Sequence, residues 1–209
     1  GISVPDYSGL RDNDRRPLHN KIVQGLYPPG STFKMAVIMA AMEAEVITPD
    51  EQIYCGGYIN ISNRRFHCWK RGGHGNVDMA KSLRESCDIY YYEMAQRTGI
   101  DNIARMARRL GLGIAHDIEM TSISEGLIPD RDWKRTRRGE DWYVGDSLNA
   151  AIGQGYVLTS PLQLAVMTAR IASGLEVNPR MVRSVGGNGP ERPAPVRFAT
   201  SRQPNVRRA

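Results

Sequence analysis

Apolar residues recur at intervals of three and four along four segments of the chain, which is the spacing of one face of an α-helix. In the first segment, alanine, methionine, valine and isoleucine follow Phe33 at this spacing. The second segment is long enough for one helix or two. The pattern predicts a mainly α-helical chain, with helices over residues 31–45, 77–99, 101–111 and 161–172.

Capping residue types mark the ends of the last two predicted helices. Asp101 is expected to cap the third helix, and Gly111 is expected to end it. Either Thr159 or Ser160 caps the fourth helix, which Gly174 ends. Both helices are therefore bounded by residues that favour helix termini.

The remaining segments lack the helical period. Residues 1–30 are interrupted by prolines and residues 114–146 are polar, so both are expected to be irregular. Residues 50–76 are rich in glycine and alternate at "YINIS", which predicts loops with short strands. The tail, residues 186–209, is rich in proline and arginine and is expected to be a solvated loop. Residues 1–185 then form one partial domain.

Composition narrows the range of functions. Of the 209 residues, 41% are hydrophobic, which is enough for one sizeable core. The formal net charge of +6 comes mostly from arginines spread along the chain, which favours a nearby anionic surface such as lipid headgroups or cell-wall polymer. The basic residues do not form a stripe interleaved with aromatic residues, so nucleic acid is not an expected partner.

Targeting signals are missing from the sequence. No apolar run approaches the roughly 20 residues of a membrane span. No signal peptide opens the chain, and neither does a starting methionine. We expect an internal piece of a longer protein, with any export signal or anchor outside it.

The stretch "GLYPPGSTFK", residues 25–34, presents a serine and a lysine at the head of the first predicted helix. Helix positions three apart share a face, so Ser31 and Lys34 are expected to lie together. Free backbone N–H groups at this end favour developing negative charge, and a lysine that has lost its proton acts as a base for serine. In the structural alternative, Ser31 caps the helix and Lys34 extends to solvent.

A second serine lies downstream in "SLRESCDIYYYEMA", residues 82–95. A serine and lysine spaced as above belong to a three-part set of motifs found in penicillin-binding proteins and serine β-lactamases, whose second part is Ser-Asp-Asn. Ser86 and Asp88 supply a related Ser-x-Asp. In the functional interpretation, Ser86 joins a proton relay and Asp88 is a polar partner of Lys34 or of substrate. In the structural alternative, both residues cap a helix.

Together, "GLYPPGSTFK", "GHGNVDMAKSLRESCDIYYYEMA" and "AIGQGYVLTSPLQLA" resemble the transpeptidase domain of class B penicillin-binding proteins of the cell-elongation type, in order over most of residues 1–180. The resemblance implies the helical part of the α/β fold shared with serine β-lactamases, with most of the central sheet outside this chain. It implies that Ser31 attacks the penultimate D-Ala of a peptidoglycan stem peptide. Terminal D-Ala leaves, and an amine of a neighbouring stem peptide resolves the acyl-enzyme. β-Lactam antibiotics acylate the same serine.

The family's third motif, Lys-Ser/Thr-Gly, does not follow the second motif here, because the last lysine is Lys134. The triplet Arg97-Thr98-Gly99 comes too early and has the composition of a helix end. The resemblance implies that the missing strand aligns substrate and supplies an oxyanion-hole N–H, whose loss typically costs about 10²–10³ in rate. The isolated chain is therefore expected to be inactive or barely active.

Three cysteines, the only ones in the chain, form a candidate metal site with a histidine: Cys55, Cys68, Cys87 and His74. Three thiolates and one imidazole make a closed tetrahedral set, which is typical of structural zinc without a catalytic role. The resemblance adds that relatives carry ligand residue types at matching places. Cys87 lies inside the second motif, so the metal would hold that motif from behind. The alternatives are one disulfide with a spare thiol, buried small residues, or His67 as a competing ligand.

The resemblance also implies partners and a location. The expected partners are peptidoglycan stem peptides, β-lactams, a membrane glycosyltransferase and other elongation-complex proteins. The expected location is the periplasmic face of the bacterial inner membrane. Two other functions stay open: a serine β-lactamase or D,D-carboxypeptidase, for which no deacylating base is found, and a non-catalytic zinc-stapled scaffold or sensor.

Overall fold

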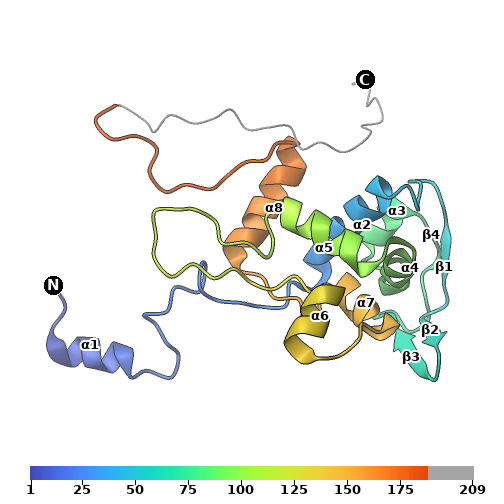
Figure 1. Ribbon diagram of the computed structural model, residues 1–209, viewed down its shortest axis with the longest axis horizontal. Helices are drawn as coiled ribbons and strands as arrows, with labels where there is room; N and C mark the ends of the chain where they lie inside the picture. The colour runs from blue at the N-terminus through green and yellow to red at the C-terminus, as the bar shows by residue number, and fades with distance from the viewer. Residues whose placement is uncertain (188–209) are drawn as a thin grey trace.

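Three helices that the apolar pattern predicts build the core. In the computed structural model, α2 (Lys34–Glu43) packs against α4 (Asp88–Thr98) and α5 (Ile100–Arg109), and α4 also packs against α7 (Val144–Ala151) (Figure 1). α2 is apolar and buried over most of its surface, as expected of a helix at the centre of a domain. The mainly helical fold class is thus confirmed.

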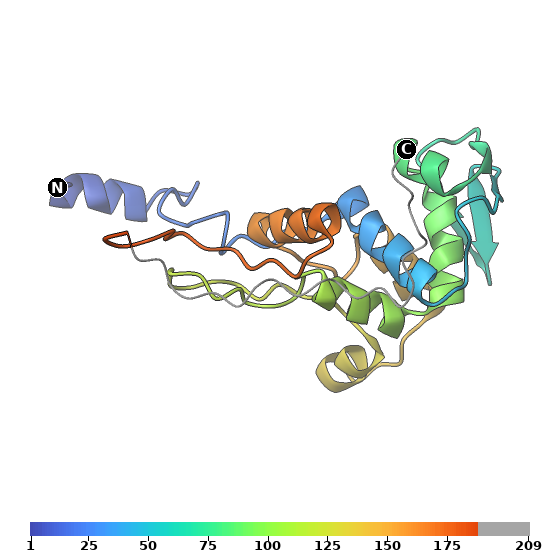
Figure 2. The same ribbon diagram turned by 90° about the horizontal axis from the view of Figure 1, so that it is seen from above.

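The other helices surround this core or extend from it. The structure describes residues 1–187, so most of the predicted tail lies outside the described residues. No helix among the described residues is long and apolar enough to cross a membrane. The remaining helices are α1 (Val4–Arg11), which lies at the far end of the long axis (Figure 2), α3 (Met79–Arg84), α6 (Arg131–Arg138) and α8 (Pro161–Ser173).

Two antiparallel pairs of short strands lie at the end of the molecule opposite α1, beside α4 (Figure 1). In the first pair, β1 (Ile53–Cys55) runs against β4 (Gly75–Val77). In the second pair, β2 (Tyr58–Ile61) runs against β3 (Arg64–His67). The prediction of loops with short strands between residues 50 and 76 is therefore confirmed.

The two segments predicted to be irregular also contain helices, so these predictions are wrong. α1 forms within residues 1–30 because Pro5 lies in the first helical turn, where the missing N–H costs nothing, and Ser3 caps the helix. α6 forms within residues 114–146, and α7 begins at their end, at Val144. Asp130 accepts a hydrogen bond from the Trp133 N–H and begins α6, and Gly139 ends it in a left-handed conformation.

Helix ends agree with the sequence in one case and differ in another. α8 begins after Ser160, whose hydroxyl accepts from the Gln163 N–H, and it ends at Gly174 as predicted. Asp101 does not cap α5; it lies in the first turn. Gly99, at φ 77°, both ends α4 and begins α5, so the chain has no room for a separate capping residue between them.

Candidate functional site

Ser31 lies on a 3₁₀ turn, η1 (Gly30–Phe33), that leads directly into α2. The prediction of an α-helix from residue 31 is therefore wrong by one turn, because the chain enters the helix through the tighter 3₁₀ geometry that is common at helix amino ends. Ser31 makes no capping hydrogen bond to η1 or α2. Lys34 is only 1% exposed, so it does not extend to solvent. The structural alternative for this pair is wrong.

The Lys34 ammonium uses all three of its donors on the second motif. Its Nζ lies 2.9 Å from the Ser86 carbonyl, 2.9 Å from Ser86 Oγ and 2.7 Å from Asp88 Oδ1. The two charged side chains are 2% and 13% exposed, so this is a nearly buried ion pair. Such a pair is tolerated only when its hydrogen bonds are complete, as they are here.

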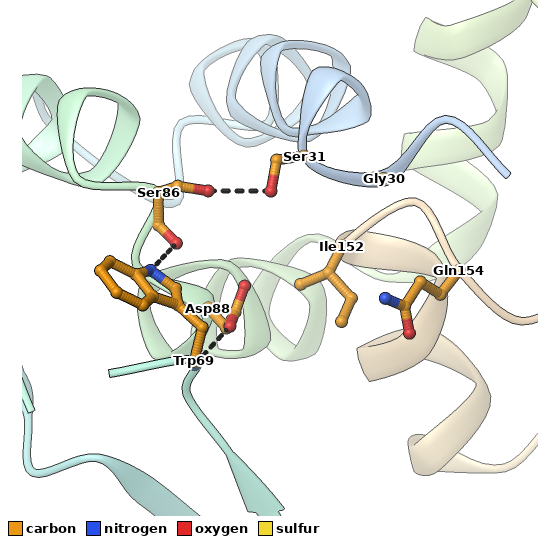
Figure 3. A pocket seen from close by; sticks show the side chains of 7 residues that line it. All are labelled: Gly30, Ser31, Trp69, Ser86, Asp88, Ile152 and Gln154. Atoms are coloured by element: carbon orange, nitrogen blue, oxygen red, sulfur yellow. Dashed lines mark hydrogen bonds between the residues drawn. The ribbon is translucent and has the colours of Figure 1, made fainter. Parts of the chain in front are cut away.

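Ser86 connects the lysine to the first serine. Ser86 Oγ lies 2.8 Å from Ser31 Oγ (Figure 3). With the Lys34 contacts, this makes a continuous chain from Ser31 through Ser86 to Lys34 and Asp88. Ser86 has a left-handed backbone, with φ 50°, at a cost of about 1 kcal/mol. It lies between α3 and α4 and caps neither. The structure thus brings together all four residues of the predicted catalytic set.

Trp69 was not singled out from the sequence, yet it holds the second motif from the other side. Its backbone N–H donates to Asp88 Oδ2 at 2.9 Å, and its indole N–H donates to the Ser86 carbonyl at 3.1 Å (Figure 3). The indole N–H also donates to the Glu85 carbonyl at 3.1 Å. The only available sequence signal is its position directly after Cys68. An open pocket of about 380 Å³ is lined by Gly30, Ser31, Trp69, Ser86, Asp88, Ile152 and Gln154.

The segment "AIGQG" packs its backbone against the turn that carries Ser31. The Gly30 N–H donates to the Gly153 carbonyl at 3.0 Å. A Cβ on Gly153 would lie 2.2 Å from the Gly30 carbonyl oxygen, and Gly153 has φ 68°. Two backbones approach here more closely than any side chain permits, so this contact sets the position of Ser31.

A Gly153→Ala variant is expected to lower the free energy of unfolding by about 2–4 kcal/mol and to displace Ser31. Gly139→Ala is the matched control, because Gly139 has the same φ of 68° but open space around its Cβ position. The control is expected to cost only the left-handed backbone penalty, about 1 kcal/mol. Urea denaturation of both variants checks this, and equal losses would contradict the close-approach argument.

The three cysteines and His74 converge in a buried cluster behind the second motif. Their ligand atoms all lie within 4.8 Å of one another. The Sγ atoms of Cys55 and Cys68 each lie 3.5 Å from His74 Nδ1. A tetrahedron with Zn–S of about 2.3 Å and Zn–N of about 2.0 Å has a sulfur–nitrogen edge of about 3.5 Å. The donor set therefore fits a zinc ion in both chemistry and spacing.

Two of the alternatives for this cluster, the disulfide and His67 as a ligand, disagree with the structure. All three cysteines are free thiols in the described chain, so no disulfide forms. His67 is exposed and is not among the clustered ligands. Burial lowers the pKa of His74, which keeps its imidazole in the neutral form that ligates metal. Burial also raises the pKa of the Cys68 thiol, so a thiolate here needs a nearby cation.

Comparison with known proteins gives one family. The family model described as the penicillin binding protein transpeptidase domain matches residues 2–208. The peptidoglycan D,D-transpeptidase MrdA of Acinetobacter baumannii is 39% identical over 193 residues, which is 91% of this chain and 29% of that protein. The chain thus spans less than a third of that relative's length.

Two solved structures share the fold over nearly the whole chain. Pseudomonas aeruginosa penicillin-binding protein 2, in complex with WCK 5153, is 39% identical with a TM-score of 0.87, covering 94% of this chain and 45% of that chain. Helicobacter pylori penicillin-binding protein 2, in complex with MreC, is 34% identical with a TM-score of 0.87, covering 96% of this chain and 37% of that chain.

Proposed function

Because the chain belongs to the penicillin-binding protein transpeptidase family, we propose that it carries the acylation centre of a peptidoglycan D,D-transpeptidase that acts in cell elongation. One observation carries the proposal: an unbroken hydrogen-bond chain runs from the Ser31 hydroxyl through Ser86 to a buried lysine. A serine needs such a path to a base before it attacks an acyl carbon. A capping serine needs none.

The proposed reaction begins once the Lys34 ammonium has lost one proton to solvent, so that its Nζ has a lone pair that accepts a proton. Ser31 Oγ attacks the carbonyl carbon of the penultimate D-Ala, and its proton moves through the Ser86 hydroxyl to Lys34 Nζ. The amide C–N bond then breaks, and the terminal D-Ala leaves with a proton on its nitrogen. An amine of a second stem peptide attacks the ester, forms the cross-link and frees Ser31. Hydroxyl hydrogens rotate, so the same oxygen chain carries protons in either direction.

Asp88 and Trp69 serve this reaction as positioning residues in the proposal. The carboxylate stabilises the Lys34 ammonium that forms when the proton arrives, at a distance of 2.7 Å. The Trp69 N–H groups fix the other carboxylate oxygen and the Ser86 carbonyl. The 209-residue sequence has no Lys-Ser/Thr-Gly triplet after the second motif, so the third element of the site needs further chain.

The cysteine cluster is proposed to hold a structural zinc ion. Cys55, Cys68, Cys87 and His74 would fill all four coordination positions, which leaves none for water or substrate. The ion supplies charge compensation for buried thiolates and a rigid cross-link. Cys87 is bonded to both Ser86 and Asp88, and Cys68 is bonded to Trp69, so the cross-link would immobilise the second motif from behind.

Partners and location follow from the relatives. Since the penicillin-binding protein 2 of Helicobacter pylori is solved in complex with MreC, we expect the full-length protein to work with elongation-complex proteins and a membrane glycosyltransferase. We expect this work to take place at the periplasmic face of the inner membrane. β-Lactams are expected to acylate Ser31 as substrate analogues.

Labelled penicillin tests the function on the full-length protein. Intact mass is expected to rise by one adduct per chain, and peptide mapping is expected to place the adduct on Ser31. The adduct should persist for many minutes, because no deacylating base accompanies the serine. Steady turnover of penicillin would favour the β-lactamase alternative. A protein that stays unlabelled would favour the scaffold. The 209-residue chain alone is expected to label weakly.

A further inference from the structure

The strand lobe, which we define as residues 53–77, carries positive charge without any compensating carboxylate. Its sequence contains Arg64, Arg65, Lys70 and Arg71 and has no aspartate or glutamate. All four cations are exposed. None of the four forms an ion pair within residues 1–187. Their charge is therefore available to something outside the described chain.

Several arginines elsewhere in the domain are paired with carboxylates. Arg97 bonds Glu51 and Glu93, and Arg108 bonds Asp130. Other pairs of this kind are Arg109 with Glu43, Arg131 with Asp101 and Arg135 with Asp132. The strand lobe has no carboxylate of its own for such pairs. Its exposed cations can therefore attract an external anion.

One of these cations, Arg65, shares a face of the β2–β3 pair with two aromatic side chains. Side chains alternate along a strand, so Tyr58 and Arg65 share a face with His67, and Arg64 points to the other face. The Arg65 guanidinium lies 4.2 Å from the Tyr58 ring centroid, and the rings of Tyr58 and His67 lie 6.0 Å apart. A Cβ on Gly57, the residue before Tyr58, would lie 2.1 Å from the Arg71 carbonyl oxygen, so the Arg71 backbone lies beside the start of β2.

Exposed aromatic rings accompany the cations and connect them to the serine pocket. Tyr58 is 44% exposed and Trp69 is 63% exposed, and large aromatic side chains at a surface are typical of binding interfaces. Trp69 lines the pocket of Ser31 (Figure 3), and Lys70 and Arg71 follow it directly in the chain. A polymer with one end in the pocket therefore passes Trp69 and then reaches these cations.

We propose that the basic face, formed by Tyr58, Arg65, His67, Lys70 and Arg71, binds the acidic stem peptides that flank the reacting one on an uncross-linked peptidoglycan strand. The inference rests on the proposed function, which brings such a strand to Ser31. Charge complementarity selects this occupant: stem peptides carry free carboxylates at regular intervals along the glycan. Repeated anions on one polymer suit a row of cations that leads away from a single reactive pocket.

Binding of a glycan strand by the full-length protein tests the proposal. A Ser31→Ala background prevents acylation, and the probe is a soluble, uncross-linked glycan strand that retains its stem peptides, followed by fluorescence anisotropy. An R65Q/R71Q variant is expected to bind about fivefold more weakly, since each exposed ion pair contributes only modestly to affinity. Added salt should remove most of the difference. An R65K/R71K variant, which retains the charge, should restore binding.

The matched control is R64Q/R105Q, which also removes two positive charges, one from the opposite face of the hairpin and one from α5. It is expected to bind as the wild type does. Strands stripped of their stem peptides should bind both variants equally. Equal affinities of R65Q/R71Q and R64Q/R105Q for intact glycan strands would overturn the proposal, because the basic face would then not contribute to binding. A loss of affinity that persists on stripped glycan strands would also overturn it, because the stem-peptide carboxylates would then not be the ligand.

A parallel measurement separates this inference from the proposed function. In the Ser31 form, both charge variants are expected to react with labelled penicillin at the wild-type rate, because penicillin is too small to reach the basic face. If wild-type protein is not labelled, the proposed function fails. If labelling is normal and the affinity for the glycan strand does not depend on Arg65 and Arg71, only the basic-face inference fails.

Discussion

A Lys34→Met variant of the full-length protein is expected to be acylated by penicillin about 10³-fold more slowly than the wild type. The substitution removes the proposed base that is hydrogen-bonded to Ser86 Oγ, while an unbranched side chain of similar length remains. The measurement is the second-order rate constant of adduct formation, followed by intact mass after quenching at timed intervals. Ser31→Ala is expected to form no adduct and sets the baseline.

Loss of the buried charge also affects stability, and a further variant separates the two effects. Lys34→Met leaves the nearly buried Asp88 carboxylate without its partner, which is expected to cost about 3–5 kcal/mol of unfolding free energy. Lys34→Met/Asp88→Asn removes the unpaired charge and should regain most of this stability without regaining acylation. If the double variant acylates at the wild-type rate, Lys34 is not the base.

Metal removal is expected to give the second large effect. The purified full-length protein should contain one zinc ion per chain by elemental analysis. Chelation should lower the thermal midpoint by about 10 °C or more, because binding energy at a structural zinc site is folding energy and about 1 kcal/mol shifts the midpoint of a domain this size by about 2–4 °C. Acylation of Ser31 should slow in parallel, and added zinc should restore both.

A Cys87→Ser variant provides the control for chelation. It removes one of the four ligands inside the second motif and replaces a sulfur by a poorer zinc ligand. The variant is expected to have a low thermal midpoint that chelator does not lower further. The zinc proposal would be contradicted if the wild-type protein is purified without metal and its thermal midpoint does not change with chelator. The thiols would then be buried packing residues.

The sequence predicts the reactive residues of this site better than it predicts the residues and helices that hold them in place. Ser31, Lys34, Ser86 and Asp88 are recognisable because each motif is a short local pattern with a fixed spacing. The residues of the proposed zinc site are recognisable because cysteine is otherwise absent from the chain. Residue type alone therefore identifies both groups, although only the fold brings them together.

Trp69 and α6 show why the rest is not predictable from the sequence. The contacts of Trp69 with Asp88 and Ser86 bridge residues 17 and 19 positions apart, so no local spacing reveals them. α6 has no apolar stripe, because the side chain that it buries is Lys134, held by Asp146 at 2.7 Å. A helix anchored by a buried ion pair gives no hydrophobic period, and only its caps reveal it.

The sulfur cluster behind the second motif has a consequence for inhibition. Cys68 and Cys87 are bonded directly to residues that line the serine pocket, but their sulfurs lie on the opposite side, with each cysteine at most 1% exposed. A compound that binds or displaces these sulfurs would inactivate Ser31 without occupying the pocket. Such a compound needs no β-lactam ring. The hydrolases by which bacteria resist penicillins would therefore not inactivate it.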